Sequence, residues 1–170
     1  MTRYEPLINI TLRELAWLGA FVFWVYYKKP AGSSFLELRL DPVGIIGLVL
    51  VVAGIVLQLW SAMVLAVAIT NPTDPGGSLA KEGPYRYVRN PIYITGAMVF
   101  IGLYLIYAEF RPVDLVAAIV VGSLLHFYVV RIEEPATLKR LGAPYDKYRG
   151  HVPRWVPELP FRFTGTNRSS

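Results

Sequence analysis

The sequence predicts an all-α integral membrane protein with about four transmembrane helices, followed by a short cytoplasmic C-terminal helix and a tail. Composition is the first observation: 54% of the 170 residues are hydrophobic and only 17% are charged, far from the average of soluble domains. The apolar residues also gather in segments of about 20, the length that crosses the hydrocarbon of a bilayer as a helix. Because these segments lack the alternation of polar and apolar residues, a transmembrane β-barrel is excluded.

Four segments are expected to cross the membrane, and their order divides the chain. They lie at residues 7–27, 43–69, 92–110 and 113–132. We treat the chain as a single membrane domain, 1–170, made of a two-helix N-terminal part (1–69), a part that carries the polar motifs (70–160) and a flexible tail (161–170). The first segment has no small-residue cleavage site after it, so a retained anchor is expected rather than a signal peptide.

The second segment carries a predicted packing face. Gly47, Gly54 and Ser61 recur every seven residues, which places three small side chains on one side of a helix. Gln58 is a polar side chain in apolar surroundings, and a hydrogen bond to another helix is its expected role. The segment should therefore pack closely against a neighbour.

The charge distribution predicts the orientation and the partners. With four spans, the N-terminus, the 70–91 loop and the C-terminal tail share one side and hold twelve of the 17 basic residues, while the opposite side holds four. The positive-inside rule then places both termini in the cytoplasm. The net charge of +5 favours anionic lipid head groups, whereas no nucleic-acid-binding motif is present. The chain has no cysteine, which excludes disulfides and cysteine metal sites.

Two polar motifs flank the third and fourth segments and return to the same membrane face. The first is Gly-Pro-Tyr-Arg-Tyr-Val-Arg-Asn-Pro-Ile-Tyr at 83–93, in which Asn90 and Pro91 suit the N-cap and first position of a helix. The second contains Glu133 and Glu134, carboxylates at a bilayer boundary that are costly unless paired. Arg131 is the nearby candidate to neutralise them. Two distant pieces of sequence can therefore build one site.

The residues after the acidic motif are expected to form short helical segments at the cytoplasmic face. Pro135 should break or restart the helix, a short helix should follow from 136 to 141, and Gly142 should end it. Tyr145 and Tyr148 are three apart and can share a helical face.

The joint pattern resembles the isoprenylcysteine carboxyl methyltransferase and phospholipid methyltransferase superfamily. The similarity runs from about residue 77 to 157, through Gly-Pro-Tyr-x-Tyr-x-Arg-Asn-Pro-x-Tyr and then Glu-Glu-x-x-x-Leu-x-x-x-Gly-x-x-Tyr-x-x-Tyr-x-x-x-Val-Pro. These are small helical membrane enzymes that use S-adenosylmethionine and need no metal. The resemblance implies that the 70–160 part is catalytic and that the cofactor lies against Leu79, Ala80, Tyr85, Arg89, Asn90, Pro91, Ile92, Tyr93, Glu133 and Glu134.

Two departures from the family pattern bear on the chemistry. The family commonly has His where this chain has Asn90, which does not titrate near neutral pH, so proton transfer at this position is disfavoured. The isoprenylcysteine branch has an arginine at the position of Val129, and Arg131 could substitute from an adjacent turn. His126 lies two helical turns before Glu133 and could act as a base toward an amine acceptor, or could be a hydrogen-bonded interior residue.

The resemblance favours a methyltransferase whose acceptor is a lipid or amphiphile, with Glu133, Arg131 and His126 as the candidate catalytic residues. The acceptor atom, whether of a carboxylate or an amine, stays open, as does the oligomeric state. Two alternatives also stay open. One is a non-catalytic membrane scaffold or carrier that binds no cofactor, and the other is a reductase-like membrane enzyme that uses NADPH.

Overall fold

The structure is a computed structural model that describes residues 41–71, 77–107 and 112–157, with four single positions at 19, 23, 26 and 27. In these ranges the chain is helical and contains no strand. The elements are α2 (Pro42–Thr70), the 3₁₀ turn η1 (Gly83–Arg86), α3 (Pro91–Tyr107), α4 (Pro112–Tyr128), the π-helical turn η2 (Val129–Glu133), α5 (Glu134–Leu141) and α6 (Ala143–His151). The span predicted at 7–27 lies outside the described residues, apart from those four positions.

The all-helical prediction is confirmed for the described chain, and two helices have the length and apolarity needed to cross a membrane. They are α2 and the continuous helix Pro112–Leu141, while α3 is apolar but shorter. The helices predicted at 43–69, 92–110 and 113–132 correspond to α2, α3 and α4, although α3 ends at Tyr107 and residues 108–111 are not described.

α2 begins and packs as elementary helix chemistry dictates. The Asp41 side chain accepts a hydrogen bond from the Gly44 amide at 2.9 Å, and Pro42 occupies the first turn, where its missing N–H costs nothing. Farther along α2, Gly47 lies so close to α3 that a Cβ there would stand 2.6 Å from the Gly102 carbonyl oxygen. Gly54 and Ser61 are also buried, so the predicted small-residue packing face is confirmed.

A polar contact joins the same two helices. The Thr95 hydroxyl of α3 lies within hydrogen-bond distance of the Gln58 side-chain oxygen of α2, and Thr95 is buried. The prediction that Gln58 bonds to another helix is therefore confirmed. Because apolar surroundings offer no water to replace it, this bond also fixes the register of α2 against α3.

Of the two outcomes predicted at Pro135, the structure shows the restart and not the break: α5 begins at Glu134, directly after η2, with Pro135 in its first turn. A proline has no N–H, and its ring collides with the carbonyl four residues earlier in a regular α-helix. Here the turn widens instead, and the Glu134 amide donates to the Val129 carbonyl five residues back. The predicted end of α5 is confirmed: Gly142 has a φ of 63° and its amide donates to the Leu138 carbonyl at 2.8 Å.

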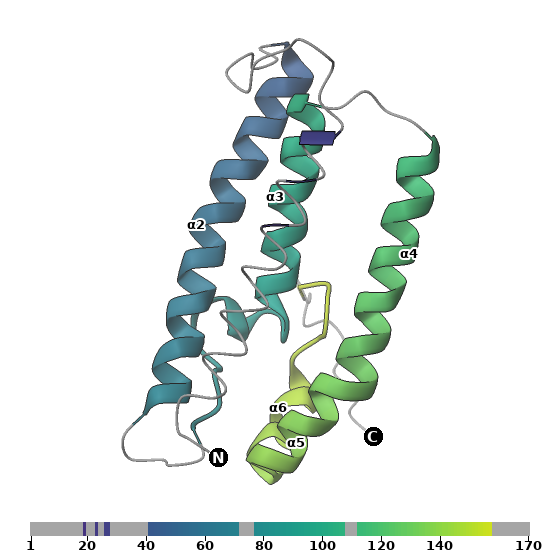
Figure 1. Cartoon of the computed structure of the whole chain (residues 1–170). Helices are drawn as coiled ribbons and strands as arrows, with labels where there is room; N and C mark the ends of the chain where they lie inside the picture. Colours follow the sequence, from purple (N-terminus) through teal and green to yellow (C-terminus); the bar gives the residue numbers. More distant parts are fainter. Residues whose placement is uncertain are drawn as a thin grey trace, which may run out of the picture.

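The arrangement gathers the polar motifs at one end of the molecule (Figure 1). α2 and α3 run side by side, and α4 stands apart from them in this view. The start of α3, the end of α4 and the short helices α5 and α6 lie at the same end. The segment after α6 returns from there toward α3. The predicted convergence of the loop motif and the acidic motif therefore has a structural basis.

Candidate active site

Tyr93 and Glu133 join the two motifs directly. The Tyr93 hydroxyl on the first turn of α3 donates a hydrogen bond to Glu133 Oε2 at 2.6 Å, across 40 residues of sequence. A bond this short from a hydroxyl to a carboxylate oxygen is typical of a charge-assisted pair. The π turn of η2 carries Glu133, and its backbone carbonyl accepts from the Thr137 hydroxyl at 2.9 Å. The expectation that the motifs meet is thus confirmed.

Glu134 is the buried carboxylate of the site, and two arginines neutralise it. Glu134 is only 7% exposed. Arg154 makes a two-pronged contact, Nε to Oε1 and Nη2 to Oε2, both at 2.8 Å, and Arg89 Nη1 lies 3.3 Å from Oε1. Such a fork matches the planar geometry of a carboxylate and is stronger than a single ion pair. The contact with Glu134 also raises the pKa of the Arg154 guanidinium.

Arg131 does not take the neutralising role expected of it. Its side chain is exposed on η2, and its guanidinium carbon lies 5.7 Å from the centre of the Phe127 ring, one turn earlier. A residue that precedes Glu133 by two positions points to a different side of the helix. The charges that meet Glu134 come instead from Arg89 in the loop motif and from Arg154 near the end of the described chain.

Residues 152–155, here called the C-terminal strap, tie the tail to the loop motif. The Arg89 amide donates to the Pro153 carbonyl at 2.9 Å, and Asn90 Nδ2 donates to the Arg154 carbonyl at 3.4 Å. The Asn90 side chain, which was expected at the cofactor, therefore also binds the strap. Backbone and side-chain bonds together fix the strap across the start of α3.

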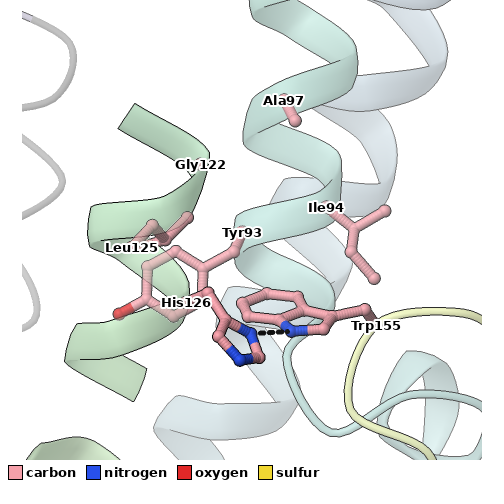
Figure 2. Close-up of a pocket in the computed structure, with 7 residues that line it drawn as sticks. All are labelled: Tyr93, Ile94, Ala97, Gly122, Leu125, His126 and Trp155. Atoms are coloured by element: carbon pink, nitrogen blue, oxygen red, sulfur yellow. Dashed lines mark hydrogen bonds between the residues drawn. The ribbon is translucent and has the colours of Figure 1, made fainter. Parts of the chain in front are cut away.

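Trp155, the last residue of the strap, lines an open pocket between α3 and α4 (Figure 2). Its indole Nε1 lies 3.0 Å from His126 Nδ1 on α4, and its ring meets the Tyr93 ring edge-on at a centroid distance of 6.3 Å. The cavity measures about 320 Å³ and is lined by Tyr93, Ile94, Ala97, Gly122, Leu125, His126 and Trp155. Tyr93 therefore touches both the acidic motif, through its hydroxyl, and the cavity, through its ring.

The remaining predicted cofactor residues fall into two groups. Ala80 and Tyr85 pack in a buried cluster with Ala68 of α2, and the Tyr85 carbonyl accepts a bond from the Tyr148 hydroxyl at 2.6 Å. The side chains of Ala80 and Tyr85 therefore pack the loop against α2. In the other group, Pro91 and Ile92 are buried at the start of α3, directly before Tyr93, and Leu79 is half-buried in the loop.

The tyrosines of α6 lie in the same polar region and stay protonated. Tyr145 and Tyr148 share a helical face, as predicted, with ring centroids 6.1 Å apart. Burial raises the pKa of both phenols, and the negative charge of Glu134 adds to the effect at Tyr145. Both therefore act as neutral hydrogen-bonding groups at physiological pH.

Sequence reasoning missed Arg154 and Trp155 as site residues. A signal was present: Pro153 stops the chain from continuing a helix, and a basic and an aromatic residue follow it directly. An arginine within about 20 residues of two boundary carboxylates is a natural partner for them. What the sequence lacks is the direction in which the chain turns after α6.

The residues present fit S-adenosylmethionine. The half-buried Glu133 carboxylate and the Tyr93 and Trp155 rings suit a sulfonium, which is attracted by negative charge and by aromatic faces. Arg89 Nε is buried and has no hydrogen-bond partner among the described residues, which leaves a donor beside the site for a carboxylate. Within the described ranges, no group of three His, Cys, Asp or Glu side chains is arranged to hold a metal ion.

The fold and the site define a helical protein of membrane character whose polar residues converge at one end. A model of the family described as phospholipid methyltransferase matches residues 43–143, more than half of the chain. The chain therefore belongs to this family, which confirms the resemblance seen in the sequence. Membership indicates a methyltransferase that acts on lipid-like substrates. Comparisons with curated proteins and with solved structures gave no match. The matched range includes both motifs and ends before the strap.

Proposed function

We propose that the protein is an integral membrane methyltransferase that transfers a methyl group from S-adenosylmethionine to a lipid or amphiphile at the cytoplasmic face. The observation that carries the proposal is the 2.6 Å contact between Tyr93 and Glu133, which joins the two motifs of the family pattern. Family membership supports the class of reaction and the lipid-like acceptor.

The chain's own residues have distinct tasks in this proposal. S-adenosylmethionine, when bound, would supply a methyl group on a sulfonium: the acceptor atom would bond to the methyl carbon in line as the carbon–sulfur bond breaks, and S-adenosylhomocysteine would leave. Glu133 offsets positive charge where little water competes, and Tyr93 holds one of its oxygens in place. Glu134 does not face the cofactor as a free charge. Its ion pairs with Arg89 and Arg154 keep the loop and the strap together around the site.

The cavity between α3 and α4 suits the acceptor. Four of its lining residues are apolar or lack a side chain: Ile94, Ala97, Gly122 and Leu125. A hydrocarbon chain in this space would approach Tyr93 from the side of its ring, while the cofactor lies on the side of Glu133. Holding donor and acceptor in line is the main source of rate in such a reaction, and alignment alone can supply about 7 kcal/mol or more.

Calorimetry on the detergent-solubilised chain tests the cofactor assignment. We expect S-adenosylhomocysteine to bind and NADPH not to bind. A scaffold or carrier would bind neither, and a reductase-like enzyme would bind only NADPH, so either result would reject the proposal. A methylation assay with radiolabelled cofactor and a lipid extract then identifies the class of acceptor.

Orientation has a separate test, because the chain has no cysteine. We expect a single cysteine introduced as Asp146→Cys on α6 to be labelled by an impermeant maleimide only after cells are opened. The matched variant Val113→Cys, at the other end of α4, should be labelled in intact cells. The reverse pattern would contradict the cytoplasmic placement of the site.

A further inference from the structure

The contact between Trp155 and His126 determines which nitrogen of the imidazole carries the proton. An indole N–H only donates, so His126 Nδ1, at 3.0 Å from Trp155 Nε1, must accept with its lone pair (Figure 2). In a neutral imidazole the proton then resides on Nε2. His126 is therefore held in the Nε2–H tautomer.

His151 provides the opposite case in the same chain. Its Nδ1 lies 2.7 Å from the Lys147 carbonyl oxygen, which only accepts, so Nδ1 of His151 must carry a proton. These are the chain's two histidines. His151 therefore bonds to its own helix through Nδ1, whereas the Nδ1 partner of His126 is Trp155.

We propose that Trp155 is a positioning residue that makes His126 a hydrogen-bond donor, through Nε2–H, to an anionic oxygen of the methyl acceptor. This inference rests on the proposed function. The oxygen belongs to a phosphodiester or to a carboxylate, which share the required chemistry. With Nδ1 occupied and Nε2 protonated, His126 has no lone pair with which to remove a proton, so the structure favours a donor over the base considered from the sequence.

The placement of the pair explains why the donor would meet an acceptor head group. His126 and Trp155 line the pocket together with Tyr93, whose hydroxyl is bonded to Glu133, and the other lining residues are apolar or lack a side chain: Ile94, Ala97, Gly122 and Leu125. An amphiphile with its chain in the apolar part brings its polar end to the imidazole. None of the hydrogen bonds among the described residues uses His126 Nε2, which leaves this N–H for a bound molecule.

The strap makes the arrangement specific. Trp155 directly follows Arg154, whose fork onto Glu134 fixes the strap against η2 and α5. The ion pair that closes the site near the cofactor therefore also sets the position of the indole. A single segment of four residues connects the cofactor side to the acceptor side.

Nitrogen-15 NMR of the imidazole tests the tautomer without any need for activity. In the His151→Gln background only His126 contributes, and we expect the pattern of a neutral ring protonated at Nε2. Trp155→Phe keeps a ring but removes the N–H, and it should release the imidazole into a mixture of tautomers. A wild-type ring protonated at Nδ1, or a pattern unchanged by Trp155→Phe, would overturn the proposal.

Kinetics test the donor role against that of a base. His126→Gln retains an N–H donor near the Nε2 position, so its KM for the acceptor should stay within about threefold of wild type, while His126→Leu should raise KM about tenfold or more. A base would instead lose kcat equally in both variants, and that result would overturn the donor role. Trp155→Phe should raise KM with a smaller effect on kcat.

Two acceptors separate the sources of the anionic oxygen. One arm uses vesicles that contain phosphatidylethanolamine, and the other uses a farnesylated cysteine in micelles. If KM depends on His126 only with phosphatidylethanolamine, the anionic oxygen belongs to a phosphodiester, and if only with the farnesylated cysteine, it belongs to a carboxylate. A KM that does not depend on His126 with either acceptor overturns the proposal. If neither acceptor is methylated, the donor role toward a phosphodiester or carboxylate is overturned. The proposed function fails only if the lipid extract also yields no methylated product, and the NMR result decides the tautomer by itself.

Discussion

Loss of Arg154 should loosen the C-terminal strap by about 2 kcal/mol. Removing one partner of a buried ion pair costs roughly 3–5 kcal/mol, because the other charge is left buried. Two features lower this figure here: the Arg154 side chain is 27% exposed, and Arg89 stays 3.3 Å from Glu134. Since about 1.4 kcal/mol is tenfold in an equilibrium constant, Arg154→Ala should increase opening of the strap about 30-fold.

Hydrogen exchange at the Arg89 amide reports this opening. That amide donates to the Pro153 carbonyl at 2.9 Å, so it exchanges when the strap leaves. The measurement compares exchange in peptides that cover residues 85–93 for wild type and Arg154→Ala. Arg149→Ala is the matched control, because Arg149 pairs with Asp146 at 2.7 Å but both side chains are about half exposed. An exposed pair contributes about 0.5 kcal/mol or less, so this control should change exchange by no more than about twofold.

Equal exchange in Arg154→Ala and Arg149→Ala would refute the reasoning, because it would mean that burial of Glu134 does not strengthen its pair. Arg154→Lys sharpens the comparison. It keeps the charge but loses the fork, so its exchange should lie between those of wild type and Arg154→Ala.

Three further predictions address the scaffold and the site. Gly47→Ala should destabilise the α2–α3 pair by about 1–3 kcal/mol in detergent unfolding, because the added Cβ would meet the Gly102 carbonyl at 2.6 Å. Gly96→Ala, where nothing lies within 4 Å, should be neutral or stabilising, and similar losses in both variants would contradict the packing account. Tyr148→Phe should cost about 1 kcal/mol through its lost bond to the Tyr85 carbonyl. Because burial raises the pKa of Tyr148, its contribution to stability is complete below about pH 10 and declines above it. An unfolding titration should therefore show a smaller alkaline loss in Tyr148→Phe than in wild type, and identical alkaline slopes would count against the assignment. Thr95→Val removes the partner of Gln58 and should destabilise the chain by about 1 kcal/mol, whereas no loss in the same assay would show that the bond contributes nothing.

The sequence predicted the elements well where a local rule applied. The seven-residue spacing of Gly47, Gly54 and Ser61 identified the face of α2 that packs on α3. Gly142 ended α5 as its freedom at positive φ suggested. The rule for Pro135 was only partly specific. A π turn accommodates the missing N–H while the flanking residues stay helical, and the sequence does not distinguish this restart of the helix from a break.

The site was predictable in part for a similar reason. The meeting of Tyr93 with Glu133 followed from the expectation of four spans, which places the two motifs on the same membrane face. The partners of Glu134 did not follow, because they depend on the turn of the chain after α6, which brings Arg154 back over 20 residues of sequence. The expected Arg131 was near in sequence, yet helical geometry directs it toward Phe127. A contact between residues on either side of a folded segment can be predicted only when the three-dimensional course of that segment is known.

A double-mutant cycle on S-adenosylhomocysteine affinity tests most directly whether the tyrosine and the carboxylate act as one cofactor site. Calorimetry would compare wild type, Tyr93→Phe, Glu133→Gln and the double variant in the same detergent. If the 2.6 Å bond orients the carboxylate toward the ligand, each single change weakens binding and the double variant is little weaker than Glu133→Gln alone. Losses that add independently, or affinities equal to wild type in both single variants, would contradict the account.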